Sequence, residues 1–200
     1  MVNGASSLEN LAKSFASMPG VSMKFAWKLA FYVLTLKRDE VLSISNNIIE
    51  AFDKTKRCSV CQNFTDKEVC NICSNKNRDK SKICVVQYPK DVFNLERCNA
   101  YFGRYHVLHG LLSPAEGIGP NKITIKELVQ NIKQSDCIKE VILATNPTVE
   151  GEATAMYIAN ILKSFNLSLT RIAYGISVGS EIQHADSMTI LKAIENRNKI

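Results

Sequence analysis

The chain has 200 residues, of which 46% are hydrophobic and 22% are charged. This composition is typical of a folded, soluble protein with one ordinary domain or two to three small ones. The apolar runs are short, such as residues 141–144, and the first thirteen residues lack a basic region followed by an apolar core. The sequence therefore predicts no bilayer-spanning segment and no signal peptide, and we expect a cytoplasmic location with reduced cysteines.

The net charge of +6 at pH 7 is concentrated in one stretch of the chain. Residues 1–53 carry no net charge, residues 54–82 carry +5, and residues 83–200 carry +1. A local basic patch attracts polyanions. The alternative is a solvated basic surface without a partner, and charge alone does not separate the two.

The first part of the chain, residues 6–54, predicts three helices. Apolar residues recur at helical spacing over 8–15, over about 24–36 and from about 39 onward. The segment MPGVS separates the first two helices, which predicts a hairpin that presents backbone N–H groups to a ligand. Lys24 and Lys28 share one face of the second helix, where both could reach a phosphate backbone without reading base sequence. An ordinary αα-hairpin with a glycine turn is the alternative.

The most specific motif is a pair of Cys-x-x-Cys sequences. Cys58 and Cys61 precede Cys70 and Cys73 by a linker of eight residues, which is short enough for both pairs to hold one ion. Four thiolates suit tetrahedral Zn²⁺, and such a closed site is structural rather than catalytic. We predict one zinc per chain, with an Fe–S cluster or a redox pair as alternatives. The basic residues around the motif are Lys56, Arg57, Lys67, Lys76 and Arg78.

The remainder of the chain predicts an α/β domain. Short apolar runs alternate with helical stretches, which is typical of βαβ units and a largely parallel sheet. We expect Cys84, Cys98 and Cys137 to be buried as small hydrophobic residues, and His109 to be packed in or beside a strand. The predicted strands are 83–86, 105–108, 141–144 and 171–173, and the predicted helices are 92–98, 125–132 and 150–165.

One strand end in this region has polar residues suited to a ligand site. The strand at 141–144 leads into a loop and then into a helix that opens with Glu150 and Glu152. Ligands of open α/β sheets bind at the carboxyl ends of the strands, and the first strand ends at Gln87 beside the same crevice if the sheet is doubly wound. Favourable interaction of the two acidic residues with the helix dipole is the alternative explanation.

These motifs together resemble a known family. The segment ATNPTVEGEA at 144–153 resembles the metal-site motif of Toprim domains, which occur in topoisomerases, primases and some nucleases. This segment, the four paired cysteines and several shorter blocks occur in an order and at a spacing similar to those of the RecR recombination-mediator family. The similarity extends over almost the whole chain. The shorter blocks are MPGVSMK at 18–24, GRY at 103–105, LSP at 112–114, GIGP at 117–120, GISVG at 175–179 and DSMTIL at 186–191.

The resemblance implies an α+β chain of four parts. These are a helix–hairpin–helix at 1–55, a four-Cys zinc module at 56–80, a Toprim-like α/β domain with a mostly parallel sheet at 81–176, and a C-terminal tail at 177–200. It also implies DNA binding through Lys24 and Lys28, which match the family's basic positions.

Two departures from the family patterns bear on function. Catalytic Toprim domains hold Mg²⁺ with a Glu and an Asp-x-Asp pair, whereas this chain has Gln87, Asn146 and Thr148. A neutral amide cannot act as a general base, so we predict no catalytic residue, and Glu150 and Glu152 become candidates for contact with a protein partner. In the hairpin, Ser22 stands where the family has glycine, and a left-handed backbone there would cost about 1 kcal/mol. Met23 departs from the family pattern as well.

The implied function is that of a non-enzymatic mediator in recombinational DNA repair. The resemblance implies partnership with the RecO and RecF proteins, help in loading RecA at single-stranded gaps, and a homo-oligomer that surrounds DNA as a ring-shaped tetramer in the nucleoid. The alternatives from other classes are a Mg²⁺-dependent Toprim nuclease or primase-like enzyme and a zinc-stabilised scaffold that binds only proteins. No membrane partner is expected.

Overall fold

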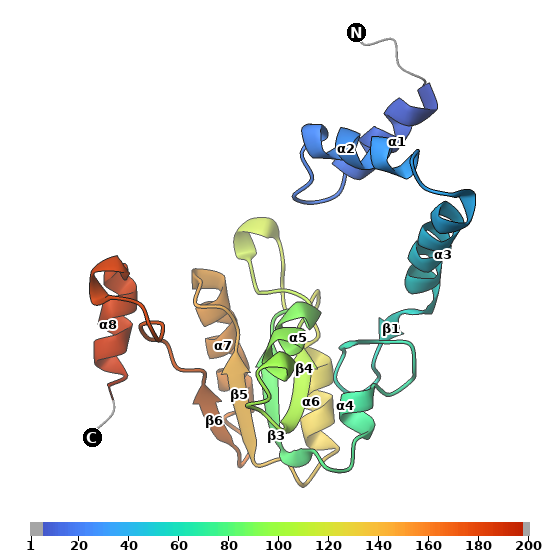
Figure 1. Ribbon diagram of the computed structural model, residues 1–200. Helices are drawn as coiled ribbons and strands as arrows, with labels where there is room; N and C mark the ends of the chain where they lie inside the picture. The colour runs from blue at the N-terminus through green and yellow to red at the C-terminus, as the bar shows by residue number, and fades with distance from the viewer. Residues whose placement is uncertain (1–5, 198–200) are drawn as a thin grey trace. The chain divides into compact units, whose positions relative to one another are not determined.

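The computed structural model describes residues 6–197, which form two compact units that divide between Thr55 and Lys56. Helices come first along the chain, then the cysteine-rich segment, and then alternating strands and helices (Figure 1). The outermost residues of the predicted parts 1–55 and 177–200 lie outside the described residues. Within residues 6–197, no helix is both long enough and apolar enough to cross a bilayer.

The first unit contains the three predicted helices, α1 (Ser6–Ala16), α2 (Met23–Val33) and α3 (Arg38–Lys54). Helices α1 and α2 contact each other through small side chains, because the buried residues of the pair are alanines. Such side chains let two helix backbones approach closely while burying little apolar area. The buried alanines are Ala12, Ala26 and Ala30.

The hairpin between α1 and α2 accommodates serine without strain. Gly20 takes the left-handed conformation, with φ of 81°, whereas Ser22 is extended, with φ of −73° and ψ of 153°. The Ser22 hydroxyl accepts a hydrogen bond from the Phe25 amide at 3.3 Å and so caps the start of α2. The penalty expected for a left-handed Ser22 is therefore absent, because this residue begins the helix instead of forming the turn.

The second unit opens with the cysteine-rich segment. Strands β1 (Lys56–Arg57) and β2 (Phe64–Thr65) form a short antiparallel hairpin, and helix α4 (Asn71–Ser74) follows it. The segment buries its four paired cysteines, against which Val60, Val69 and Ile72 pack. An apolar core this small leaves the cysteines as the main stabilising feature of the segment.

A four-stranded, all-parallel sheet forms the centre of the second unit (Figure 1). Its order is β4 (Gly103–Val107), β3 (Asp79–Val86), β5 (Glu140–Ala144) and β6 (Ser168–Arg171). The predicted parallel sheet is confirmed. The last strand begins three residues earlier than the predicted range of 171–173.

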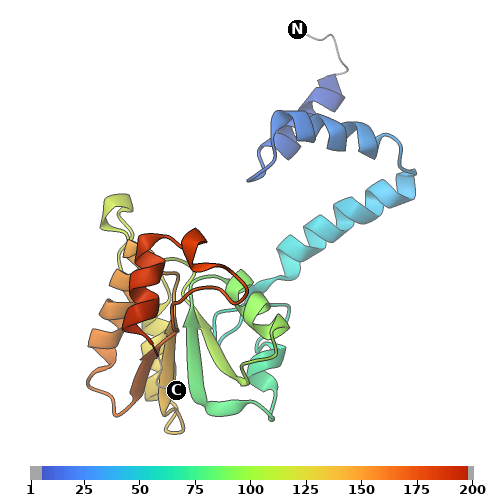
Figure 2. The ribbon, with the colours of Figure 1, turned by 60° about the vertical axis from the view of Figure 1, so that its left-hand side comes forward.

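Helices cover both faces of this sheet (Figure 1, Figure 2). Ile83 and Val85 of β3 face the core that includes α6 (Ile125–Lys133) and α7 (Val149–Leu162). Cys84 and Val86 face the opposite core with Val92 of α5 (Pro89–Arg97). This division follows from the two-residue period of a strand, which points successive side chains to opposite faces.

Two of the three remaining cysteines differ from expectation. Cys84 is buried in the sheet, as predicted, but Cys98 and Cys137 are exposed. Cys98 lies just past the end of α5, and Cys137 lies in the loop between α6 and β5. An apolar or helical sequence context does not bury a residue at the end of an element, where the chain returns to the surface.

Beyond β6 the chain forms a tail with a 3₁₀ turn, η2 (Ile182–His184), and helix α8 (Ser187–Glu195). Asp186 caps α8 by accepting hydrogen bonds from the Met188 and Thr189 amides, both at 3.0 Å. None of the nine described residues of α8 is buried.

Candidate functional site

The four paired cysteines form one cluster. All four sulfur atoms lie within 4.8 Å of one another, and each cysteine is at most 7% exposed. Tetrahedral Zn–S bonds of about 2.3 Å require sulfurs about 3.8 Å apart, so small side-chain adjustments bring Cys58, Cys61, Cys70 and Cys73 to a zinc ion. Among residues 6–197 this is the one group of His, Cys, Asp or Glu side chains close enough to hold a metal.

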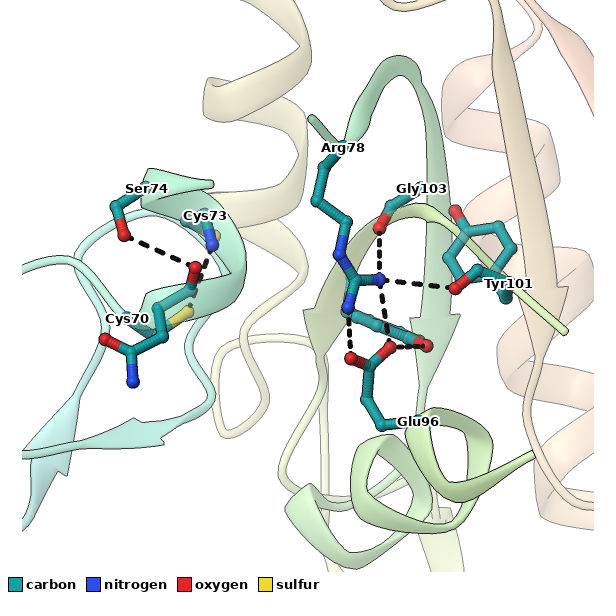
Figure 3. A network of polar contacts seen from close by, with 9 residues as sticks. Cys70, Cys73, Ser74, Arg78, Glu96, Tyr101 and Gly103 are labelled. Atoms are coloured by element: carbon teal, nitrogen blue, oxygen red, sulfur yellow. Dashed lines mark hydrogen bonds and ion pairs between the residues drawn. The ribbon is translucent and has the colours of Figure 1, made fainter. Parts of the chain in front are cut away.

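Backbone turns place the sulfurs and stabilise their charge. Gln62 has a φ of 63°, and this left-handed residue turns the chain so that the Cys58 amide donates to the Asn63 carbonyl at 2.8 Å. The Cys70 amide donates to the Cys58 sulfur at 3.3 Å. The Cys73 amide donates to the Cys70 sulfur at 3.4 Å (Figure 3). Amide N–H groups directed at sulfur favour the thiolate form that zinc requires.

The first Cys-x-x-Cys turn also contacts the α/β domain. Three successive carbonyls accept its hydrogen bonds: that of Val60 from the Asn131 side chain at 3.4 Å, that of Cys61 from the Val107 amide at 2.9 Å, and that of Gln62 from His109 Nε2 at 2.6 Å. The zinc module and the sheet are thus connected through the backbone of a metal-ligating turn.

A second connection is made by Arg78, which lies between the zinc module and β3 (Figure 3). Its guanidinium pairs with Glu96 of α5 and donates to the Tyr101 carbonyl at 3.2 Å and the Gly103 carbonyl at 3.3 Å. Glu96 also accepts a hydrogen bond from the Tyr105 hydroxyl at 2.7 Å. Partial burial opposes ionisation of Glu96, but hydrogen bonds from Arg78 and Tyr105 outweigh it and lower the Glu96 pKa.

This pairing reduces the basic patch that the sequence predicts around the cysteines. The Arg78 side chain is 13% exposed and its charge is balanced by Glu96, while Lys56 lies 3.5 Å from Glu68. Among the residues that the structure describes, Arg57, Lys67 and Lys76 remain exposed without an ion pair, and Lys67 donates a hydrogen bond to the Asn71 side chain at 3.2 Å. The patch around the zinc module is therefore smaller than its summed charge suggests.

Replacing Glu96 by alanine is expected to lower the free energy of unfolding by about 2 kcal/mol, because it leaves a partly buried guanidinium without its partner. The folded-state pKa of Glu96 is lowered from 4.5, so its contribution is complete above pH 4.5 and disappears as the pH falls through the folded-state value. Denaturant unfolding at pH 7 and at low pH measures both effects. Glu68→Ala is the control: its ion pair is exposed, so we expect a change below about 0.5 kcal/mol. Equal effects of the two variants at pH 7 would contradict the assignment.

In the first unit, Lys24 and Lys28 lie in the first turns of α2, on the exposed side of the helix. The helix contains no acidic residue, and neither lysine forms an ion pair with any residue in 6–197. The positive end of the helix dipole and two unpaired ammonium groups therefore coincide at one end of α2.

The second predicted site lies at the carboxyl ends of the strands. Gln87, Thr148 and Glu150 line a cleft of about 520 Å³ together with His109 and the loop that follows it. The Gln87 side chain is buried, and its Oε1 has no hydrogen-bond partner among residues 6–197. The Thr148 hydroxyl accepts a hydrogen bond from the Gly151 amide at 3.1 Å, so this hydroxyl caps the start of α7. The cleft is lined by two carboxylates, Glu116 and Glu150, and by the cation of Lys122. Of the two, only Glu150 belongs to the Toprim-like motif, where a catalytic site needs several carboxylates.

Glu150 and Glu152 lie in different surroundings. Glu150 is exposed at the cleft, whereas Glu152 is bound by Arg171 at 2.7 Å and by the Tyr174 hydroxyl at 2.9 Å. Partial burial opposes ionisation of Glu152, but these two hydrogen bonds outweigh it and lower its pKa. Of the two acidic residues, Glu150 is therefore the freer to contact a partner.

Two residues of α7 shape the cleft although the sequence analysis assigned them no role. A Cβ on Gly151 would lie 2.0 Å from the Asn146 carbonyl oxygen, so only glycine lets the helix start so close to the preceding loop. The Thr154 hydroxyl donates to the Glu150 carbonyl at 2.6 Å and accepts from the Leu112 amide at 2.9 Å, which joins the helix to the opposite wall. A glycine in the first turn of a predicted helix is the sequence signal that could have indicated the close approach of Gly151 to Asn146.

The fold and the site define a class of protein: a Toprim-like α/β domain that has lost most of its acidic metal ligands, joined to a four-cysteine metal module. Comparison with known proteins agrees. Residues 81–173 match the family model of the Toprim domain, residues 55–75 match that of the RecR zinc finger domain with four cysteines, and residues 175–198 match that of the RecR C-terminal region. The four cysteines therefore form a zinc site that holds one ion.

A curated relative is similar over nearly the full length. Recombination protein RecR of Ligilactobacillus salivarius (strain UCC118) is 49% identical over 193 residues, which cover 96% of this chain and 97% of the relative. The chain belongs to the RecR family, and this membership gives it a role in recombinational repair.

Proposed function

We propose that the chain is a DNA-binding recombination mediator without enzymatic activity, acting in the cytoplasm at the nucleoid. Its task would be to help load RecA at single-stranded gaps together with RecO and RecF. The observation that carries the DNA-binding proposal is the pair of exposed lysines, Lys24 and Lys28, at the positive end of an acid-free helix. Phosphate oxygens are the groups that such a helix end attracts, and they carry no base information.

The test is a double substitution, Lys24→Ala with Lys28→Ala. We expect DNA affinity to fall by about tenfold in low salt. The slope of log K against log salt should decrease by about 1.8 for contacts with duplex DNA or about 1.4 for contacts with a single strand, because each lost phosphate contact removes about 0.9 or about 0.7, respectively. Fluorescence anisotropy with single-stranded and gapped DNA over a salt series measures both quantities.

The matched control removes the same charge elsewhere. Lys126→Ala with Lys133→Ala replaces two exposed lysines of α6 in the other unit and should leave the salt slope unchanged. Equal losses in the two double variants would mean that net charge, and not the end of α2, determines affinity. Unchanged DNA retention in the Lys24 and Lys28 variant would refute the lysine assignment.

Contact with a protein partner is proposed for the cleft, with Glu150 as the main acidic residue and Glu152 beside it. Glu150 is exposed there, while Arg171 and Tyr174 hold Glu152. RecO and RecF are the proposed partners. Retention of RecO and RecF binding after Glu150→Gln would contradict this role.

Self-association is proposed from α3. None of its 17 described residues is buried, and even the apolar side chains of Ile48, Ile49 and Phe52 are 60%, 57% and 86% exposed. Apolar side chains exposed in this number along one helix are typical of an interaction surface. A ring-shaped tetramer around DNA would bury them between copies. A mass of one chain, 22.3 kDa, by light scattering would contradict this proposal.

Two other functions are separated from this proposal by simple measurements. A Mg²⁺-dependent nuclease or primase would turn over nucleic acid with Mg²⁺ or Mn²⁺ and lose that activity with Glu150→Gln. A scaffold that binds only proteins would fail to shift any DNA, alone or with partners. The neutral Gln87 and Asn146 support the non-enzymatic function, because they supply no charge to balance a dication.

A further inference from the structure

We propose that His109 is a positioning residue through which the zinc module fixes the wall of the cleft, so that zinc occupancy controls the shape of the cleft. The inference concerns the regulation of the proposed partner site and rests on that proposed function only for its biological consequence. The mechanical coupling itself rests on contacts within the second unit.

The coupling begins at the metal-ligating turn. The carbonyls of Val60, Cys61 and Gln62 each accept a hydrogen bond from the α/β domain. Because Cys58 and Cys61 are both zinc ligands, the ion fixes the conformation of the turn that presents these carbonyls. A turn released from zinc would lose the alignment that all three hydrogen bonds require.

One of the three hydrogen bonds comes from Val107 of β4, which is an edge strand of the sheet. On its inner side, the chain pairs with β3, and the Leu108 amide donates to the Val86 carbonyl at 2.9 Å. On its outer side, the Val107 amide donates to the Cys61 carbonyl at 2.9 Å. The zinc module thus satisfies a backbone group that an edge strand otherwise leaves to solvent or to another chain.

His109 carries the coupling from the strand into the loop. Its φ is 59°, a left-handed conformation that few residues other than glycine adopt. Two contacts with the zinc module accompany this conformation: its Nε2 donates to the Gln62 carbonyl at 2.6 Å, and its ring lies 5.4 Å from the Phe64 ring. Unusual backbone conformations persist where the surroundings impose them, and here those surroundings belong to the zinc module.

The loop directed by His109 forms one side of the cleft. Residues 109–111, 113, 116, 118, 122 and 123 line the cleft together with Gln87 and Glu150. The loop has hydrogen bonds that report on its order, since the Ser113 and Ile118 backbones pair with each other at 3.0 and 2.8 Å. Release of His109 would therefore loosen the wall that faces Glu150 and alter the surface offered to a partner.

Hydrogen–deuterium exchange of the full chain tests the coupling through peptides that cover residues 109–123. His109→Phe keeps an aromatic ring beside Phe64 but removes the N–H donor. We expect it to retain one zinc per chain and to raise exchange in this loop by about tenfold, the factor that corresponds to the net loss of one hydrogen bond. His109→Asn, which tolerates a left-handed backbone and keeps an N–H donor, should restore part of the protection.

Chelation gives the second arm. Removing zinc from the wild type should raise loop exchange at least as far as His109→Phe does, and chelation of that variant should add little in the loop because the connection is already broken. Asn131→Ala is the matched control. It removes the hydrogen bond that Asn131 of α6 donates to the Val60 carbonyl, and it should leave the exchange of residues 109–123 unchanged.

Two results would overturn the coupling. One is a zinc-loaded His109→Phe chain whose loop exchanges as slowly as that of the wild type. The other is a rise in loop exchange on chelation that is as large in His109→Phe as in the wild type. Binding of the proposed protein partners by the same samples reports separately on the proposed function of the cleft. If wild-type protein fails to bind them while the exchange pattern holds, the coupling stands and the partner-site proposal falls.

Discussion

Cys61→Ser is expected to abolish zinc binding and to lower the free energy of unfolding by several kcal/mol, because the binding energy of a structural zinc ion, about 10–16 kcal/mol in small zinc domains, is also folding energy. A serine hydroxyl stays protonated at neutral pH and does not replace a thiolate. The zinc module has little else to hold it, because its buried side chains are the four cysteines with partly buried Val60, Val69 and Ile72 around them. Zinc per chain by elemental analysis and denaturant unfolding measure the two effects.

Cys98→Ser is the matched control for this substitution. Cys98 is exposed and lies outside the cluster, so the variant should keep one zinc and change stability by less than about 0.5 kcal/mol. A Cys61→Ser chain that unfolds like the wild type after losing its zinc would show that the module is held by packing and not by the metal.

Gly151→Ala is expected to lower the free energy of unfolding by about 3 kcal/mol and to displace the start of α7. The added Cβ would lie 2.0 Å from the Asn146 carbonyl oxygen, and this neighbour is backbone, which cannot rotate away as a flexible side chain could. The displaced turn contains Glu150, so the cleft should change as well. Denaturant unfolding measures the loss, and exchange of the peptides around residues 146–154 locates it.

Gly119→Ala provides the comparison within the same domain. A Cβ at Gly119 meets no atom within 4 Å, so the variant should be as stable as the wild type to within about 0.5 kcal/mol. Equal losses in the two glycine variants would contradict a steric clash at Asn146, and the effect of alanine on the unfolded chain would not explain them, because that effect raises the free energy of unfolding.

The sequence alone was sufficient for features that depend on spacing along the chain. Two Cys-x-x-Cys pairs eight residues apart predicted the four-sulfur cluster, because a short linker has few ways to arrange four ligands. Alternation of apolar runs with helical stretches predicted the parallel sheet, and four-residue spacing placed Lys24 and Lys28 on one helix face. These inferences depend on local geometry, which the order of residues specifies.

Features that depend on contacts between distant residues were decided only by the tertiary structure. Arg78 counts as surface charge in the sequence, but Glu96, eighteen residues later, neutralises it. In the sequence, Glu150 and Glu152 are equivalent acidic residues, but in the folded protein Arg171 binds Glu152 and leaves Glu150 exposed. His109 meets the Gln62 carbonyl across 47 residues. Each outcome required two segments to meet in the folded sheet, and the energy of a charge or a hydrogen bond depends on the partner it finds there and not on its own chemical type.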